Sequence, residues 1–141
     1  MFILDTNVVS ELRKARAGKA NRGVTEWARG VAAELMFLSV ISLHELEHGV
    51  LLAERRDPAQ GSVLREWLDT SVAAAFADRL LPVDEHVARR AAALHVPNPA
   101  PFRDALIAAT AQVHQLTLAT RNTSDFQAAG IKLINPWDTS A

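Results

Sequence analysis

The sequence contains no cysteine among its 141 residues. It can therefore form neither a disulfide framework nor a thiolate metal site, and nothing in it requires an oxidising compartment, so we expect a cytoplasmic protein. A long hydrophobic run is missing as well, because the apolar start Met1–Leu4 stops at Asp5. No later run approaches the roughly 18 apolar residues of a membrane span, so secretion and membrane insertion are both disfavoured.

The chain also lacks an excess of charge of one sign. Fifteen Lys and Arg stand against sixteen Asp and Glu, which gives a formal net charge of −1. This balance argues against a uniformly basic surface for nucleic acid or membranes, so any contact with nucleic acid must be local. With 49% apolar and 22% charged residues, residues 1–141 are predicted to form a single globular domain.

Short apolar runs alternate with amphipathic segments along the chain. The runs predicted to be buried strands are Phe2–Leu4, Met36–Ser39, Leu116–Ala119 and Lys132–Ile134, with Leu80–Val83 as an edge strand. The segments predicted to be helices are Val24–Ala33, Leu43–Ala53, Ser62–Ala77, Asp84–His95 and Phe102–His114. This alternation predicts an α/β fold with a central, mostly parallel sheet of four to five strands and helices on both faces.

Four acidic residues hold similar positions relative to these elements. Asp5 ends the first strand, and Glu45 lies in the first turn of the helix after the second strand. Asp104 lies in the first turn of a later helix, and Asp125 follows the strand Leu116–Ala119. Ligands of open α/β sheets bind outside the carboxyl ends of the strands. The four acids therefore converge if the helix of Asp104 packs at the same edge.

Helix capping is the structural alternative for three of these acids. Ser42–Glu45 spells a capping box, Asn122–Asp125 spells a similar cap, and Asp104 could complement its helix dipole. Asp5 differs, because a carboxylate that ends an apolar strand needs a partner for its charge. Four acids at one sheet edge would repel one another strongly without a cation. A cluster rich in oxygen and poor in His suits Mg²⁺ or Mn²⁺.

The blocks around these acids resemble the motifs of PIN domains. They are Asp5-Thr6-Asn7, Ile41–Gly49 around Glu45, Asp104–Ala111, and Ala119–Phe126 around Asp125. The chain is most similar to the VapC-type toxins of bacterial toxin–antitoxin pairs, and its ending Asn135-Pro136-Trp137 is similar to that of their FitB-like branch. The resemblance covers nearly the whole chain.

This resemblance implies a PIN-like fold and a metal-dependent endoribonuclease that acts as a toxin. Its catalytic acids map onto Asp5, Glu45, Asp104 and Asp125. We expect Asp5 and Asp104 to bind Mg²⁺ or Mn²⁺ directly, and Glu45 and Asp125 to act through water or accept its proton. Some relatives place the fourth acid where this chain has Asn122, and we favour Asp125 for that role.

Polar neighbours of the acids are candidates for supporting roles. Thr6, Asn7, Thr120 and Asn122 could orient or weakly coordinate, although Thr6 or Asn7 could equally cap the first helix. Arg103 and Arg121 each flank an acid and are candidates for binding RNA phosphates, with a surface charge as the alternative.

The resemblance also implies two protein partners: a cognate antitoxin that blocks the acid crevice, and a second copy of the chain in a homodimer. A partner helix needs an apolar groove, and some residues could line one or belong to the core instead. These residues are Val24, Trp27, Val31, Val63, Leu64, Trp67 and Leu68.

A competing motif overlaps one of the acids. His44-Glu45-Leu46-Glu47-His48 matches H-E-x-x-H, in which two His bind Zn²⁺ and the Glu is the general base. Such a site needs a third protein ligand, which His86, His95 or Glu66 would have to supply. A zinc hydrolase is therefore the weaker alternative. A non-catalytic binding module is the other, and a missing acid would mark it, but all four acids are present.

Overall fold

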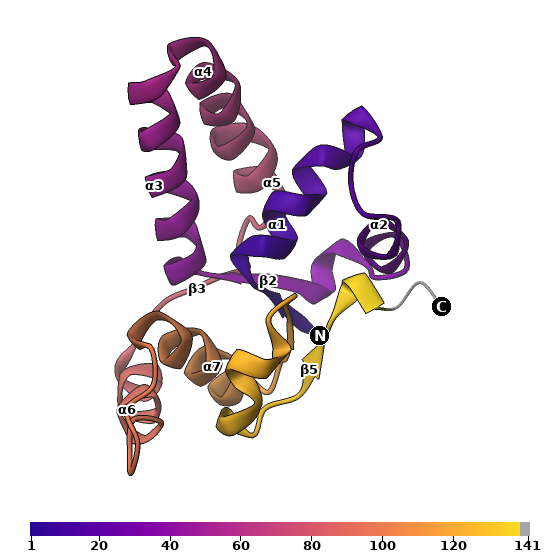
Figure 1. The fold of residues 1–141 in the computed structure, drawn as a ribbon. Coiled ribbons are helices and arrows are strands. Elements are labelled where there is room, and N and C mark those ends of the chain that lie inside the picture. Colours follow the sequence, from indigo (N-terminus) through magenta and orange to yellow (C-terminus); the bar gives the residue numbers. More distant parts are fainter. Residues whose placement is uncertain (139–141) are drawn as a thin grey trace.

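A five-stranded parallel sheet forms the centre of the structure (Figure 1). The computed structural model describes residues 1–138. The strands are β1 (Phe2–Leu4), β2 (Met36–Ser39), β3 (Leu80–Leu81), β4 (Thr117–Ala119) and β5 (Leu133–Ile134). Their order is β3-β2-β1-β4-β5, and each neighbouring pair is parallel. The predicted mostly parallel sheet, including its edge strand near Leu80, is confirmed.

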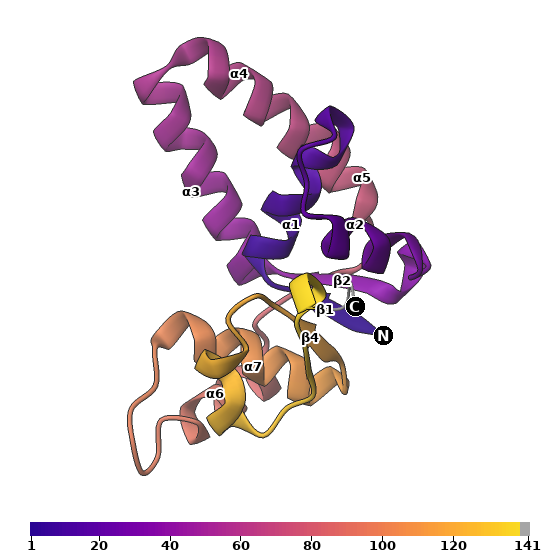
Figure 2. The ribbon, with the colours of Figure 1, turned by 45° about the vertical axis from the view of Figure 1, so that its right-hand side comes forward.

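Helices cover both faces of this sheet, as predicted (Figures 1 and 2). They are α1 (Thr6–Arg13), α2 (Arg22–Arg29), α3 (Val40–Arg56), α4 (Pro58–Glu66), α5 (Ala73–Ala75), α6 (Glu85–Ala93) and α7 (Phe102–His114). In both views α1, α3 and α4 lie on one side of the sheet, and α6 and α7 lie on the other. No helix of residues 1–138 is long and apolar enough to cross a membrane.

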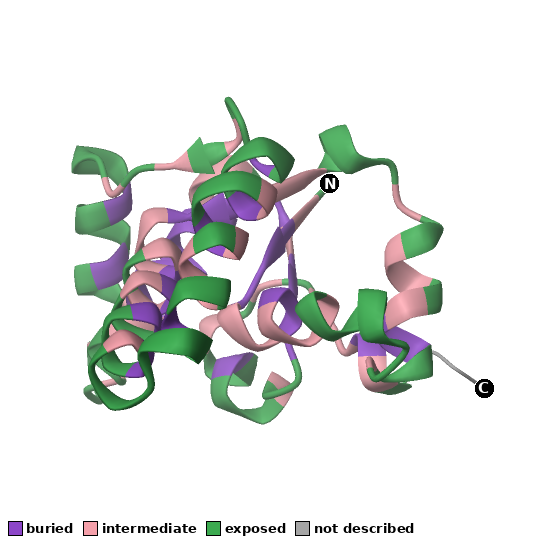
Figure 3. Cartoon of the chain, turned by 90° about the horizontal axis from the view of Figure 1, so that it is seen from above, coloured by how far each residue is buried: buried purple, intermediate pink, exposed green. Residues whose placement is uncertain are grey.

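The core lies on both faces of the central strands, where the ribbon of Figure 3 is coloured as buried. Successive side chains of a strand point to opposite faces, so a strand covered on both sides is apolar throughout. Leu4 packs in one cluster with Val8 and Leu38, whereas Ile3 packs in another with Ile107. This explains the continuous apolar run at the start of the chain.

The order in which strands are added to the sheet reverses between β1 and β4. The chain places β2 and β3 on one side of β1 and then returns to place β4 and β5 on the other. The backbone N–H of Asp5 donates to the carbonyl of Ala119 over 2.9 Å, so the residues after the two strands stay side by side. Such a switch point is where open α/β sheets form a crevice.

The structure corrects the predicted start of α3. The helix begins at Val40, directly after β2, and its N-cap is Ser39, whose Oγ accepts a hydrogen bond of 3.0 Å from the N–H of Ile41. Ser42 lies inside the helix and is buried, so the predicted capping box from Ser42 to Glu45 is wrong. Glu45 therefore does not take part in capping the helix. The bounds of α7, in contrast, match the prediction at both ends.

The predicted helices Ser62–Ala77 and Val24–Ala33 also differ. The first is α4 from Pro58, a π-helical segment at Trp67–Val72, and α5. Asp57 caps α4, and its Oδ1 accepts from the N–H of Gln60. The second ends at Arg29, because Gly30 forms its C-cap. Apolar spacing alone detects neither the cap at Asp57 nor a stop at glycine.

Candidate active site

Asp5 is a buried carboxylate with a full set of donors. Its side chain is 1% exposed, and Oδ1 accepts hydrogen bonds from the N–H of Thr6 at 2.8 Å and from Nη2 of Arg103 at 2.7 Å. Oδ2 accepts from the hydroxyl of Thr120 at 2.8 Å. Asp5 is also the N-cap of α1, so neither Thr6 nor Asn7 caps that helix. A buried carboxylate requires such hydrogen-bond partners. This requirement was predicted from the position of Asp5 at the end of an apolar strand.

The guanidinium of Arg103 lies among three of the four predicted acids. Besides Asp5, its Nη1 contacts Oδ1 of Asp104 at 2.5 Å, and its Nε pairs with Oε2 of Glu45. The contacts therefore join the end of β1 to the second turn of α3 and the first turn of α7, so Glu45 lies one turn further into its helix than predicted. Burial alone would lower the pKa of Arg103, but the hydrogen bond to Glu45 and the attraction of Asp5 raise the pKa above its usual value. This guanidinium, predicted to bind RNA phosphates, has carboxylate partners within the protein.

Glu45 is positioned by a neighbouring helix. The hydroxyl of Thr6, in the first turn of α1, donates to Oε1 of Glu45 over 2.6 Å. The side chain of Glu45 remains 30% exposed. Thr6 therefore holds this acid in the orientation in which it pairs with Arg103.

Asp104 and Asp125 line a small cavity. It has a volume of about 60 Å³ and lies beside the first turn of α7. Burial raises the pKa of Asp104, and the charges of Asp5 and Asp125 raise it further against the opposing effect of Arg103. Asp125 itself is exposed and makes no ion pair with Arg103 within the described chain. The structure thus gathers three acids around one guanidinium and places the fourth beside Asp104.

The loop after β4 is fastened by the other predicted supporting residues. The N–H of Asn122 donates to Thr120 Oγ1 over 3.1 Å, and the N–H of Arg121 donates to Asn7 Oδ1 over 3.3 Å. Asn122 is the N-cap residue of the 3₁₀ helix Thr123–Ala129, as predicted, but its side chain makes no capping hydrogen bond. These bonds hold the loop against the start of α1.

Arg121 stacks on an aromatic ring near the C-terminal end of the described chain. Its guanidinium carbon lies 5.2 Å from the ring centroid of Trp137, a cation–π distance. Arg121 is exposed. The contact links the Thr-Arg pair after β4 to the Asn135-Pro136-Trp137 segment, which sequence spacing could not reveal.

The donor set fits a hard divalent cation. Asp5, Glu45 and Asp104 offer only carboxylate oxygens, the ligands that Mg²⁺ and Mn²⁺ prefer, and all three already converge on one positive charge. Within residues 1–138, no group of three or more His, Asp or Glu is arranged to hold a metal ion. The guanidinium of Arg103 takes the point at which the three carboxylates meet.

Comparison with known proteins places this chain in a family. Residues 2–132 match the family model described as the PIN domain. The chain belongs to the PIN domain family. It is 40% identical over 143 residues to the toxin FitB of Neisseria gonorrhoeae, a match that covers 97% of this chain and 99% of FitB. The predicted resemblance is confirmed.

Further relatives agree with this assignment of the PIN domain. The VapC ribonuclease Y4jK of Sinorhizobium fredii is 38% identical over 143 residues, covering 98% of this chain and 99% of the relative. The crystal structure of FitAcB from Neisseria gonorrhoeae superposes with a TM-score of 0.88 at 38% identity, covering 98% of this chain and 99% of that chain. Fold and motifs thus point to the same family.

Membership of the PIN domain family does not favour a zinc site at His44, Glu45 and His48. His44 and His48 are exposed on α3, with ring centroids 6.4 Å apart, and Glu45 between them pairs with Arg103. Of the possible third ligands, His95 Nδ1 accepts a hydrogen bond from the N–H of Ala100, and His86 lies on α6 across the sheet. Glu66 lines a separate groove. These residues do not combine into a zinc site.

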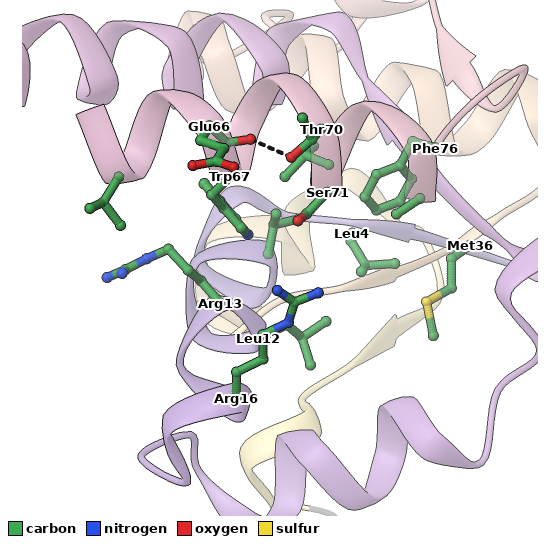
Figure 4. Close-up of a pocket in the computed structure, with 14 residues that line it drawn as sticks. Leu4, Leu12, Arg13, Arg16, Met36, Glu66, Trp67, Thr70, Ser71 and Phe76 are labelled. Carbon is green, nitrogen blue, oxygen red and sulfur yellow. Dashed lines mark hydrogen bonds between the residues drawn. The ribbon is translucent and has the colours of Figure 1, made fainter. Parts of the chain in front are cut away.

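An apolar groove of about 550 Å³ separates α1 from the end of α4 and the π-helical segment (Figure 4). Val63 and Trp67 line it, as predicted, together with Leu12. The opposite wall is α1 and not the predicted α2, because α2 packs inward: Val24 is fully buried and Trp27 packs edge-on against Phe2. Leu68 also belongs to the core, and Leu64 and Val31 are half-buried.

Proposed function

We propose that this PIN domain is an endoribonuclease that cleaves RNA phosphodiester bonds and acts as the toxin of a toxin–antitoxin pair. The observation that carries the proposal is that the carboxylates of Asp5, Glu45 and Asp104 meet at one point, the guanidinium of Arg103, at the switch point of the sheet. Its similarity to proteins named VapC ribonuclease and toxin FitB supports the same activity.

Mg²⁺ or Mn²⁺ is the proposed cofactor, with Asp5 and Asp104 as direct ligands. When bound, the ion would polarise the scissile phosphate and lower the pKa of a bound water. Asp5 is suited to be a ligand because Thr6 and Thr120 fix both of its oxygens. Glu45, oriented by the hydroxyl of Thr6, can accept the proton of the attacking water.

Asp125 is the proposed fourth acid of the site. It is exposed at the edge of the small cavity that it shares with Asp104, so its carboxylate can act through water on a phosphate entering from solvent. Asn122 contributes to the site through its backbone contact with Thr120. Arg121, exposed and stacked on Trp137, can bind an RNA phosphate at the rim.

The groove between α1 and α4 is the proposed docking site for a helix of the antitoxin. Trp67 and Leu12 give it an apolar floor, and the basic side chains of Arg13 and Arg16 lie along it (Figure 4). An amphipathic helix with acidic residues beside its apolar face would match this surface. Homodimerisation and a single domain over residues 1–141 stay predictions.

Cleavage of RNA tests the proposed activity. The purified protein should cleave RNA in Mg²⁺ or Mn²⁺ and stop in EDTA, and Asp104→Asn should abolish cleavage while circular dichroism shows an intact fold. Asp69→Asn is the matched control, because Asp69 is exposed on the π-helical segment outside the acid cluster. Cleavage that survives EDTA, or zinc-dependent peptide hydrolysis lost with His48→Ala, would contradict the proposal.

A further inference from the structure

Arg103 is the sole basic residue of the described chain that pairs with Asp5, Glu45 or Asp104. It directs a different nitrogen to each carboxylate: Nη2 to Asp5, Nη1 to Asp104 and Nε to Glu45. Arginine usually binds carboxylates through a two-point contact with one partner. Here one cation instead serves three carboxylates from three elements, which is the way a metal ion is held.

Two of the three acids, Asp5 and Glu45, have other donors that orient them without this arginine. Asp5 keeps the N–H of Thr6 on Oδ1 and the hydroxyl of Thr120 on Oδ2, each at 2.8 Å. Glu45 keeps the hydroxyl of Thr6 at 2.6 Å. None of these donors competes with Arg103 for its place between the carboxylates. Removal of the guanidinium therefore leaves Asp5 and Glu45 in place, whereas Asp104 loses the one side-chain hydrogen bond that it makes within the described chain.

The arginine side chain is partly open to solvent. Arg103 lies in the first turn of α7, and its side chain is 36% exposed. The preceding residue, Phe102, is 75% exposed, so the start of this helix faces solvent. Arginine has a long side chain with several rotatable bonds, and a change of rotamer at this position moves the charge into water.

We propose that Arg103 is a positioning residue that stands in for the divalent cation. In the metal-free protein it holds Asp5, Glu45 and Asp104 together, and it gives up these contacts when a metal ion binds. The two cations need the same carboxylate oxygens, so they exclude one another. Only the molecules in which Arg103 has moved away can then bind the metal ion. The apparent metal affinity is therefore reduced in proportion to their fraction. This inference rests on the proposed metal-dependent function.

Binding of Mn²⁺ alone, without RNA, tests the exchange. Arg103→Gln should bind Mn²⁺ at least about tenfold more tightly than the wild type, as read from the electron paramagnetic resonance signal of free Mn²⁺, because no internal cation has to be displaced. Arg103→Lys should lie between the two, since one ammonium cannot pair with three carboxylates at once. A merely structural arginine predicts the opposite sign, because a disordered site binds metal more weakly.

Arg65→Gln is the matched control. Arg65 also pairs with three acids, Glu47, Glu54 and Asp69, but it does so on the surface between α3 and α4. Its loss should leave the affinity for Mn²⁺ unchanged. An equal gain of affinity in Arg65→Gln would overturn the proposal, because a general increase in negative charge would then explain the effect.

Thermal melting gives a second readout. In EDTA, Arg103→Gln should melt below the wild type, since the three carboxylates lose their counter-ion. Saturating Mn²⁺ should raise its melting temperature by more than that of the wild type. If Arg103→Gln does not fold, Arg103→Lys carries both measurements. Unchanged or weaker binding of Mn²⁺ in the folded variant, or no binding by any of the proteins, overturns the proposal.

Failure of this inference is separable from failure of the proposed function. Tighter binding of Mn²⁺ by Arg103→Gln, with no RNA cleavage by the wild type, would support the exchange and contradict the ribonuclease. Cleavage of RNA that depends on Mn²⁺, with equal Mn²⁺ affinity in both proteins, would support the ribonuclease and overturn the role of Arg103.

Discussion

At the scale of single residues, Asp104 carries its charge where charge is disfavoured. Burial raises its pKa, and the nearby carboxylates of Asp5 and Asp125 act in the same direction. Because the pKa is higher in the folded protein, protonation of Asp104 stabilises the fold. That contribution is complete below the ordinary pKa of aspartate and is lost as the pH rises through the raised pKa. At neutral pH the metal-free protein is therefore destabilised by ionised Asp104.

Asp104→Asn should consequently melt above the wild type in EDTA at neutral pH. The difference should shrink as the pH is lowered towards the ordinary pKa of aspartate, where the wild type also loses this charge. Mg²⁺ should stabilise the wild type by mass action and the variant less, so the order of melting temperatures can invert. Thermal melts from neutral to acid pH, with EDTA and with Mg²⁺, measure both effects.

Asp69→Asn should show neither effect, because Asp69 pairs only with the surface residue Arg65 among the described residues. A different result would count against the metal site. If Asp104→Asn melts below the wild type in EDTA and responds equally to Mg²⁺, Asp104 is a charge at a helix N-terminus, worth about 0.3 to 1 kcal/mol.

The sequence allowed the acids to be placed, but not the arginine among them. Asp5 follows a strand, Glu45 lies in the second turn of the helix that continues from β2, and Asp104 lies in the first turn of α7. The topology of a parallel sheet suffices to bring them to one edge. The direction of Arg103 depends on how the first turn of α7 packs against β1 and α3, which is a tertiary property. Its sequence position beside Asp104 predicted only a basic residue near the site.

At the scale of elements, the helix ends limited what could be predicted. The start of α7 follows from a local signal, because Pro101 stands before it. Its end follows from the limit of the apolar spacing, since Gln115 adopts the left-handed region with φ of 56° without being a typical residue for it. The start of α3 was misplaced because the helix continues directly from β2, without a loop to mark it. The π-helical segment Trp67–Val72 lines the groove, and apolar spacing at three and four residues does not distinguish it from an α-helix.

The hairpin of α3 and α4 depends on a glycine. A Cβ at Gly61 would lie 2.4 Å from the Cα of Glu54 on α3, closer than any real contact. Gly61→Ala should therefore push the two helices apart and lower the free energy of unfolding by about 1 to 3 kcal/mol. Denaturant titration measures the change.

Gly49→Ala provides the matched control for this prediction. Gly49 is exposed within α3, and a Cβ there would meet nothing within 4 Å. This substitution should be neutral or stabilise by up to about 1 kcal/mol, because alanine favours a helix. If Gly61→Ala is as stable as Gly49→Ala, the backbones of α3 and α4 separate without cost, and the close approach has no energetic role.

At the scale of the whole molecule, the two proposed functional surfaces lie on different parts of the fold. The acid cluster lies at the carboxyl ends of β1 and β4, whereas the apolar groove runs between α1 and α4. The net charge of −1 conceals this division, since the acids gather at one edge and Arg13 and Arg16 lie at the groove. Neither surface alone was visible in the composition, although the position of the acids along the chain was informative.

This separation allows a test of the toxin role in living bacteria. A nuclease whose acid cluster stays open to RNA should arrest growth when the chain is expressed without its antitoxin. Asp104→Asn should relieve the arrest, because it removes a proposed metal ligand while the groove and the fold stay intact. Growth curves after induction, with protein levels matched by immunoblotting, measure this.

Asp69→Asn should arrest growth as the wild type does, since its substitution alters charge equally but lies outside the cluster. If the wild type and Asp104→Asn are equally harmless at equal expression, the toxin role fails, although cleavage of RNA in vitro can still hold.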